Sequence, residues 1–317
     1  MKVKEMTESY IVYRRSLGEK YITGAAMLRC FARHIGGNTD AMEIDIEACS
    51  AFLYGKDGKD GKVTASWFLR YSALKWMFGW AVVRGYMEEI PLPEEKPRQP
   101  EHMTAYIYSK AELKKLFGAA MAYQKNRSKI PPECMQMILK VTYFLGLRIR
   151  ETVSIRMDDL NLQESHVIIR ESKFSKTRIV PFNHQVREML QGFAEWRASQ
   201  HPGSSDEKAL FLDRKGQPMC LETVRGCFQR IREAAGISRN DRAYYQPRLH
   251  DLRHTFAVNR LTAWYREGKD VQKHLSSLST YLGHDKVSNT SVYLAMTDEL
   301  LREASKRFKA YSNGEET

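Results

Sequence analysis

The sequence predicts a mainly α-helical protein of two domains, the second of which carries one small antiparallel sheet. Apolar residues recur at helical spacing through most of the chain, whereas the β-branched runs of a hairpin occur only between about 167 and 182. A proline-rich segment at 91–105 reads as a stiff linker between domains at 1–90 and 106–317. With 43% hydrophobic residues in 317, the chain can bury a core in each domain.

The first domain is predicted to be all-helical. Its helices are expected from Thr7 to about Leu17, from Thr23 to Gly36, from Asp45 to Tyr54 and from Thr64 to Arg84. Threonine and aspartate suit helix N-caps, and glycines follow several of the predicted ends. On the fourth helix, Arg70 and Lys75 lie off the apolar stripe, where they could meet phosphates.

The second domain begins with a capping-box pattern, Ser109-x-x-Glu112, at the start of a helix. Another helix follows Pro131–Pro132 and ends at Gly146, before a short helix and a turn at 157–160. Strands are expected at Val167–Arg170 and Thr177–Phe182, with a basic tip between them. The remaining predicted helices cover 185–199, 221–236, 246–260, 269–282 and 298–311.

The helix at Gln246–Arg260 places His250, Arg253 and His254 on one face, because positions i, i+3 and i+4 are neighbours on a helix. These cationic or proton-carrying side chains repel one another unless an anion binds between them. The planar guanidinium group of arginine suits a phosphate best. A second stripe is expected to face a core and contains Leu252, Phe256 and Ala263.

Charge, cysteine content and hydropathy indicate which partners, metal sites and cellular locations the chain is expected to have. Lys and Arg exceed Asp and Glu by 50 to 38, a net charge of +12, which favours nucleic acid over an anionic membrane as partner. Five cysteines without a CxxC pair indicate neither a zinc ribbon nor a disulfide framework. His250 and His254 share the spacing of a metalloprotease helix, but Asp251 replaces the expected glutamate and Arg253 would oppose a cation, so no metal is predicted. Without a signal sequence or a run of ~20 apolar residues, a soluble cytoplasmic protein is expected.

Four fragments in order resemble the tyrosine recombinase family of site-specific DNA recombinases, which includes phage integrases and XerC/XerD-like proteins. They are Gly146-Leu-Arg148 with Glu151, a hairpin lysine, His250-Asp-Leu-Arg253-His-Thr-Phe-Ala257, and Leu282-Gly-His284 followed by Tyr293. The resemblance spans about 106–311 and implies a mixed α+β catalytic domain at 106–317. Residues 1–90 would then be the family's helical, SAM-like core-binding DNA domain.

The resemblance implies a role for each motif residue. Arg148, Arg253 and His284 would stabilise the extra negative charge on a phosphodiester in the transition state. Tyr293 would be the nucleophile and His250 its base.

Two residues complete the implied site. Lys173 would protonate the leaving 5′ oxygen, and Glu151 would support the arginines. Lys176 is the alternative acid, but Lys173 fits the family's hairpin pattern better. Tyr281 is also near His284, yet Tyr293 alone has the family's spacing.

The implied function is site-specific recombination through a 3′-phosphotyrosine and a Holliday junction, without metal, ATP or other cofactor. The expected partners are double-stranded DNA at an inverted-repeat site and further copies in a tetramer, with partner recombinases left open. The C-terminal helix at 298–311 would dock on a neighbouring protomer, or on its own domain in free protein. A nucleoid-associated cytoplasmic location follows.

Expected DNA contacts come from Arg70 and Lys75 in the first domain and from Thr223 and Arg225 on the helix at 221–236. Two alternatives stay open. A type IB topoisomerase shares this chemistry, and a non-catalytic DNA-binding protein could share the charge pattern.

Overall fold

The computed structural model describes residues 1–55, 63–100, 104–122, 128–170, 177–200, 208–241, 243, 245–295 and 300–305. The chain divides into two compact units, Met1–His102 and Met103–Thr317, and the division falls inside the 91–105 range. The predicted fold class, mainly helical with one small antiparallel sheet, is confirmed. Among the helices that the structure describes, none is both long and apolar enough to cross a membrane.

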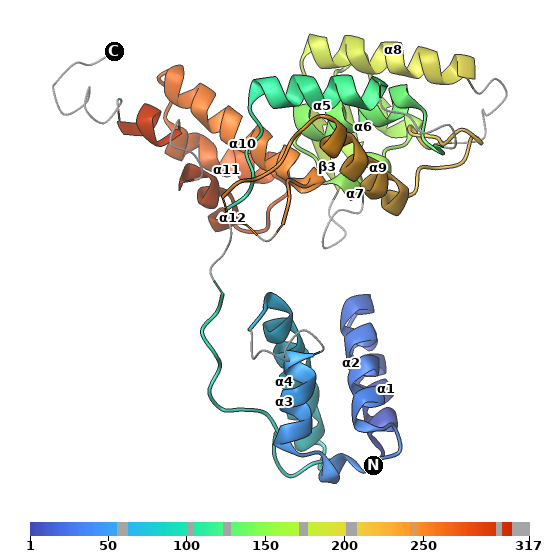
Figure 1. Cartoon of the computed structure of the whole chain (residues 1–317), viewed down its shortest axis with the longest axis vertical. Helices are drawn as coiled ribbons and strands as arrows, with labels where there is room; N and C mark the ends of the chain where they lie inside the picture. Colours follow the sequence, from blue (N-terminus) through green and yellow to red (C-terminus); the bar gives the residue numbers. More distant parts are fainter. Residues whose placement is uncertain are drawn as a thin grey trace. The chain divides into compact units, whose positions relative to one another are not determined.

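The first unit is helical, as Figure 1 shows in blue. Its helices are α1 (Val3–Ser16), α2 (Ile22–Ile35), α3 (Ile46–Tyr54) and α4 (Ala65–Val83), with a 3₁₀ turn at Ala41–Glu43. Asp45 caps α3 by accepting a hydrogen bond from the Ala48 backbone at 2.6 Å. The apolar stripe of α4 is buried in the core of the unit, where Trp67, Leu74 and Phe78 are at most 1% exposed.

One expectation for this unit is corrected, and the side chain of Arg70 has partners that the sequence did not indicate. Thr7 does not start α1, which begins at Val3; Thr7 is buried inside the helix and contacts the Met77 sulfur at 3.8 Å. The Arg70 guanidinium donates to the carbonyls of Phe52 and Leu53 at 3.2 and 3.0 Å. Arg70 therefore satisfies the open carbonyls at the end of α3, whereas Lys75 is exposed.

The second unit begins with α5 (Lys110–Ala122) and α6 (Pro132–Phe144), which pack against each other. The Ser109 hydroxyl accepts from the Glu112 backbone at 3.2 Å, as the capping-box pattern predicts. The later helices are α7 (Ile149–Val153), α8 (His184–Gln200), α9 (Leu221–Ala234), α10 (Leu249–Arg266), α11 (Val271–Leu282) and α12 (Ser288–Ser291). A 3₁₀ turn, η5, follows at Val292–Ala295.

The sheet has three antiparallel strands in the order β1 (Leu160–Asn161), β2 (His166–Ile169) and β3 (Arg178–Pro181). Val167 pairs with Leu160 on one side and with Val180 on the other. The turn expected at 157–160 is present as a 3₁₀ turn, Met157–Asp159, and Leu160 begins β1. Lys173 and Lys176 lie outside the described residues.

The described part of the C-terminal helix, 300–305, packs on its own unit. Leu300 is fully buried in a cluster with Leu261, Leu275 and Tyr293. The start of the predicted helix, at 298–299, and its residues 306–311 lie outside the described residues. The Leu300 contact therefore supports docking within the chain for this one turn.

Candidate active site

Helix α10 supports the site and carries its most buried charge. The Arg253 side chain is 1% exposed, and its Nη1 and Nη2 donate to the carbonyls of Gly146 at 2.9 Å and Leu282 at 2.5 Å. These carbonyls come from the loop after α6 and from the end of α11. Gly146 permits this approach, because its φ is +58° and a Cβ there would lie 2.3 Å from the Phe256 ring.

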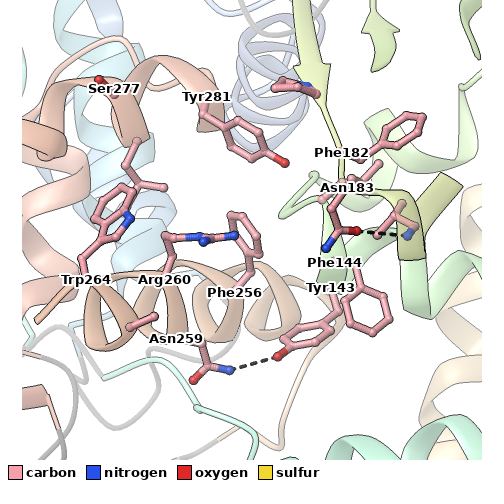
Figure 2. A pocket seen from close by; sticks show the side chains of 15 residues that line it. Tyr143, Phe144, Phe182, Asn183, Phe256, Asn259, Arg260, Trp264, Ser277 and Tyr281 are labelled. Carbon is pink, nitrogen blue, oxygen red and sulfur yellow. Dashed lines mark hydrogen bonds between the residues drawn. The ribbon is translucent and has the colours of Figure 1, made fainter. Parts of the chain in front are cut away.

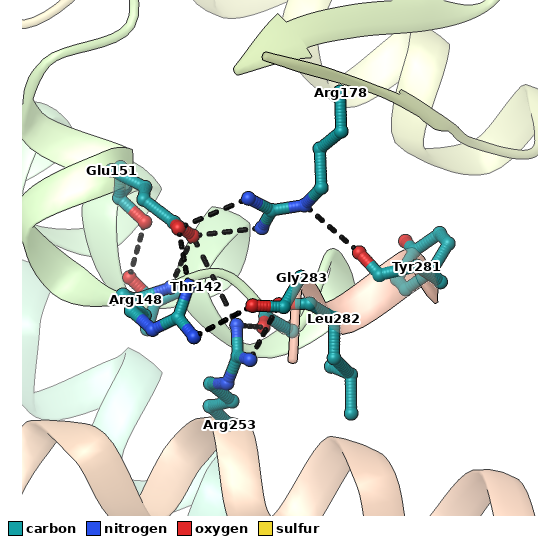
Figure 3. Close-up of polar contacts among 10 residues, drawn as sticks. Thr142, Arg148, Glu151, Arg178, Arg253, Tyr281, Leu282 and Gly283 are labelled. Atoms are coloured by element: carbon teal, nitrogen blue, oxygen red, sulfur yellow. Dashed lines mark hydrogen bonds and ion pairs between the residues drawn. The ribbon is translucent and has the colours of Figure 1, made fainter. Parts of the chain in front are cut away.

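Arg148 precedes α7 and is held by that helix's own glutamate. The Arg148 Nη1 donates to Glu151 Oε1 at 2.8 Å, and its backbone N–H donates to Glu151 Oε2 at 3.0 Å. Its Nη2 donates to the Gly283 carbonyl at 2.9 Å. Arg148 and Arg253 thus converge on the residues just before His284, although they are far apart in the sequence (Figure 3).

Arg178 on β3 is a member of the site that the sequence did not reveal. Its Nη1 and Nη2 donate to the two carboxylate oxygens of Glu151 at 3.0 and 2.8 Å, and its Nε donates to the Tyr281 carbonyl at 3.0 Å. It follows the hairpin segment that carries Lys173, but only tertiary contacts show that it reaches Glu151.

Tyr293 and His284 complete the cluster. Tyr293 lies in η5 and is 3% exposed, with its ring 6.1 Å from that of His284, centroid to centroid. The Nδ1 atom of His284 lies 2.7 Å from the Thr290 hydroxyl, which orients the imidazole. Burial raises the pKa of Tyr293, and the charges and hydrogen bonding of Arg253 and the charge of Arg148 act in the opposite direction.

The imidazole beside Tyr293 is that of His254, not the predicted His250. His254 Nδ1 lies 3.2 Å from the Tyr293 hydroxyl, whereas His250 meets the His254 ring edge-on at 4.6 Å. The reason is helical geometry, since His254 lies one turn further along α10 towards η5. His254 directly follows Arg253 in the sequence motif, and this position next to a predicted site residue could have indicated that His254 belongs to the site.

Burial and neighbouring cations set the charge states of the site. Desolvation, followed by the charge of Arg148, lowers the pKa of Arg253 to about 10. Desolvation also lowers the pKa of His254 to about 3 and that of His284 to about 4. Burial of Glu151 opposes its ionisation, but its bonds to Arg178 and Arg148 lower its pKa to about 2. The site therefore holds an ionised carboxylate, neutral imidazoles and an excess of positive charge.

His250 has a solvent-exposed side chain on the same face. The surrounding protein still desolvates its ring and, together with the charges of Arg253 and Arg248, lowers its pKa to about 4. Above that pH the imidazole is neutral and can accept a proton.

The remaining predicted contact residues lie elsewhere. In the second unit, Thr223 and Arg225 are on the first two turns of α9, where Arg225 pairs with Glu222 at 2.6 Å. Lys75 is on α4 of the first unit. Among the hydrogen bonds and ion pairs of the described residues in the second unit, neither Thr223 nor Arg225 is bonded to the cluster.

A cavity of about 720 Å³ opens between α6, α10, α11 and the start of α8 (Figure 2). Its walls are mostly apolar and include the aromatic side chains of Tyr143, Phe182, Phe256, Trp264 and Tyr281. The charged cluster lies outside this cavity, but the two share Tyr281. Its ring lines the cavity, while its carbonyl accepts the bond from Arg178.

Comparisons with known proteins identify the family of the chain. The profile of the phage integrase family matches residues 108–299. The putative integrase/recombinase y4rB of Sinorhizobium fredii (strain NBRC 101917 / NGR234) is 27% identical over 308 residues, which covers 96% of each chain. Tyrosine recombinase XerC of Bacillus subtilis (strain 168) is 27% identical over 236 residues, covering 74% of this chain and 71% of that protein.

Solved structures share the fold. The Tn1549 transposon integrase in complex with a circular intermediate DNA matches with a TM-score of 0.71 at 18% identity, covering 97% of this chain and 99% of the other. A lambda integrase tetramer bound to a Holliday junction matches with a TM-score of 0.69 at 16% identity, covering 94% and 78%.

Proposed function

The chain belongs to the phage integrase family of tyrosine recombinases, and from that premise we propose that it cleaves and rejoins DNA through a covalent bond between Tyr293 and a 3′ phosphate. The observation that carries this proposal is the convergence of Arg148, Arg253, His284 and Tyr293 on one buried cluster with excess positive charge. A phosphodiester anion is the ligand that such a cluster fits.

The arginines and His284 stabilise the transition state. As the phosphorus gains a fifth ligand, negative charge grows on its non-bridging oxygens. Donors that are already fixed can stabilise this charge without reorganising. Bonds from Arg253 to Gly146 and Leu282 and from Arg148 to Glu151 provide that fixation. The guanidiniums can then supply the charge stabilisation that metal ions provide in other phosphotransferases.

Tyr293 attacks the phosphorus while the bond to the 5′ oxygen breaks. The phenol proton must leave, and His254 is the imidazole that holds the hydroxyl in the free protein. His250 is the candidate base in the DNA-bound state, because catalytic hydrogen bonds often form only around the substrate. Lys173 is our candidate for protonating the 5′ oxygen. Rejoining reverses these steps with a new 5′ hydroxyl, so the bond energy is retained.

The assembly we propose is a tetramer on paired inverted-repeat DNA sites that exchanges strands through a Holliday junction. The lambda integrase tetramer on a Holliday junction, which shares the fold, supports this arrangement. The proposed DNA contacts are Arg70 and Lys75 of the first unit and Thr223 and Arg225 of α9. The net charge of +12 favours such binding. A cytoplasmic protein associated with the nucleoid would encounter this substrate.

The test uses nicked duplexes tiled from the DNA that flanks the gene, with SDS-resistant protein–DNA adducts as the readout. Wild type should form an adduct on one short site. Tyr293→Phe should bind that site and form none, because it lacks the nucleophilic oxygen. Tyr281→Phe is the matched control and should still form the adduct, since its ring lines the cavity beside the cluster.

Each contrary outcome is specific. A normal adduct yield from Tyr293→Phe rejects the assignment of the nucleophile. Relaxation of supercoiled plasmid without sequence preference would indicate a topoisomerase. Binding without an adduct in wild type would indicate a non-catalytic protein.

A further inference from the structure

Three arginines from three different elements bind the last three carbonyls of α11 and its cap (Figure 3). Arg178 Nε donates to Tyr281 at 3.0 Å, Arg253 Nη2 to Leu282 at 2.5 Å and Arg148 Nη2 to Gly283 at 2.9 Å. Carbonyls at a helix C-terminus lack intrahelical partners and carry partial negative charge, so guanidiniums suit them. The backbone that leads to His284 is therefore held by hydrogen bonds from three separate arginines.

The same three arginines surround one carboxylate. Glu151 accepts two bonds from Arg178 and one from the Arg148 side chain, and its Oε2 lies 3.9 Å from Arg253 Nη1. The Arg178 and Glu151 side chains are 11% and 7% exposed. Two parallel bonds between a guanidinium and a carboxylate fix orientation as well as distance.

Arg178 differs from the other two in how its donors are used. Its Nε, Nη1 and Nη2 atoms each donate to protein oxygen, and its contacts join β3 to α7 and α11. The fit is close, because a Cβ at Gly283 would lie 2.9 Å from Arg178 Nη1. A guanidinium whose donors are used in this way is suited to fix the positions of neighbouring protein groups.

We propose that Arg178 is a positioning residue for strand cleavage, which ties Glu151 to the end of α11 and so holds Arg148 and His284 in fixed relation. It acts through Glu151 and the Tyr281 carbonyl and does not touch DNA. This inference rests on the proposed function for its catalytic consequence, but the geometry it describes exists in the free protein.

The first test compares Arg178→Met with Arg197→Met. Arg197 is a matched control, since it is a buried arginine of the same unit that donates to a backbone carbonyl, that of Ala209, at 2.9 Å. Arg178→Met should slow adduct formation about 10- to 100-fold, the loss known for removal of the hydrogen-bond partner of a metal-binding side chain. Affinity for DNA and its salt dependence should not change, and Arg197→Met should cleave at the wild-type rate.

A direct contact with phosphate would give a different result. In that case Arg178→Met would weaken DNA binding and reduce the slope of log K against log salt by about 1. That outcome would overturn the proposal.

The second test asks whether Arg178 acts through Glu151. In a Glu151→Gln background, Arg178→Met should cause little further loss of cleavage rate, because the contact it supports is already weakened. Two losses that multiply would show that Arg178 acts independently of Glu151 and would reject the proposal.

A third readout needs no DNA and separates this inference from the proposed function. Nitrogen-15 NMR of the free protein should show the guanidinium protons of Arg148 exchanging with water roughly tenfold faster in Arg178→Met, and unchanged in Arg197→Met. Unchanged exchange in both would reject a positioning role. If wild type forms no adduct, the proposed function fails while this comparison still decides the role of Arg178. If Arg178→Met does not fold, Arg178→Lys serves instead, since an ammonium lacks the planar fork.

Discussion

At the scale of single residues, the imidazoles of the site are kept neutral by their surroundings. Burial, and then nearby positive charge, lowers the pKa of His254 to about 3 and that of His284 to about 4. An unfolded histidine has a pKa of about 6.5. Below that value the unfolded chain binds more protons than the folded one. The free energy of unfolding should therefore fall as the pH drops from about 6.5 towards 3.

His254→Phe should make this loss of stability shallower, because it removes one of the groups that resist protonation in the folded state. Urea unfolding of wild type and His254→Phe at a series of pH values between 7 and 4 measures the effect. His184→Phe is the control, since His184 is exposed at the start of α8. An identical pH dependence for wild type and His254→Phe would show that His254 is not desolvated. Glu151 titrates in the same direction, but between about 4.5 and 2.

Sequence motifs and tertiary contacts reveal different residues of the site. Arg148, Arg253, His284 and Tyr293 could be predicted because each lies in a short pattern with fixed spacing. Arg178 could not be assigned its role, because that role depends on contacts with Glu151 and Tyr281, which are 27 and 103 positions away. The sequence also did not show which imidazole of α10 lies beside Tyr293 in the free protein, since a shared helix face does not reveal where η5 lies along it.

At the scale of secondary-structure elements, two glycines end helices in the same backbone conformation but in different surroundings. Gly268 follows α10 with φ +68°, and nothing lies within 4 Å of the position of a Cβ. Gly283 follows α11 with φ +67°, and the Arg178 guanidinium lies 2.9 Å from that position. Substituting each glycine in turn therefore distinguishes the effect of backbone strain, which both positions share, from the effect of displacing Arg178, which only Gly283 allows.

Both Gly268→Ala and Gly283→Ala should lose about 1–2 kcal/mol of stability, the usual cost of a left-handed conformation with a Cβ. Only Gly283→Ala should also slow adduct formation, because its methyl group displaces Arg178. Thermal unfolding and the cleavage assay measure the two effects separately. Equal cleavage rates for both variants would mean that the cap of α11 does not control the site.

The bounds of α3 and α4 and the start of α5 were predictable to within a few residues. The start of α1 was wrong because Thr7, a good capping residue by type, is buried against Met77. Strand β1 was missed because two residues carry no periodicity, and only pairing with β2 defines them.

At the scale of the whole molecule, each unit has its own hydrophobic core. Leu74 is fully buried in the first unit and Leu252 in the second. Leu74→Ala should therefore destabilise the first unit by about 2–5 kcal/mol and leave the unfolding transition of the second unit in place. Leu252→Ala should do the reverse. Calorimetry of the full chain measures both, and transitions that shift together in either variant would contradict independent folding.

One carboxylate, that of Glu151, is shared by the three guanidinium groups of Arg148, Arg178 and Arg253. This imbalance of charge affects the stability of the free protein. Without DNA, the fold confines more cations than anions, so an oxyanion that enters acts as a missing counter-ion. By linkage, an ion that binds only the folded state stabilises it by RT ln(1 + c/Kd), where c is the free ion concentration. Sulfate should thus raise the melting temperature of wild type more than that of Arg148→Gln. An equal rise in both would reduce the effect to the general action of the salt. A larger rise in wild type would mean that the enzyme is at its least stable when no oxyanion occupies the site.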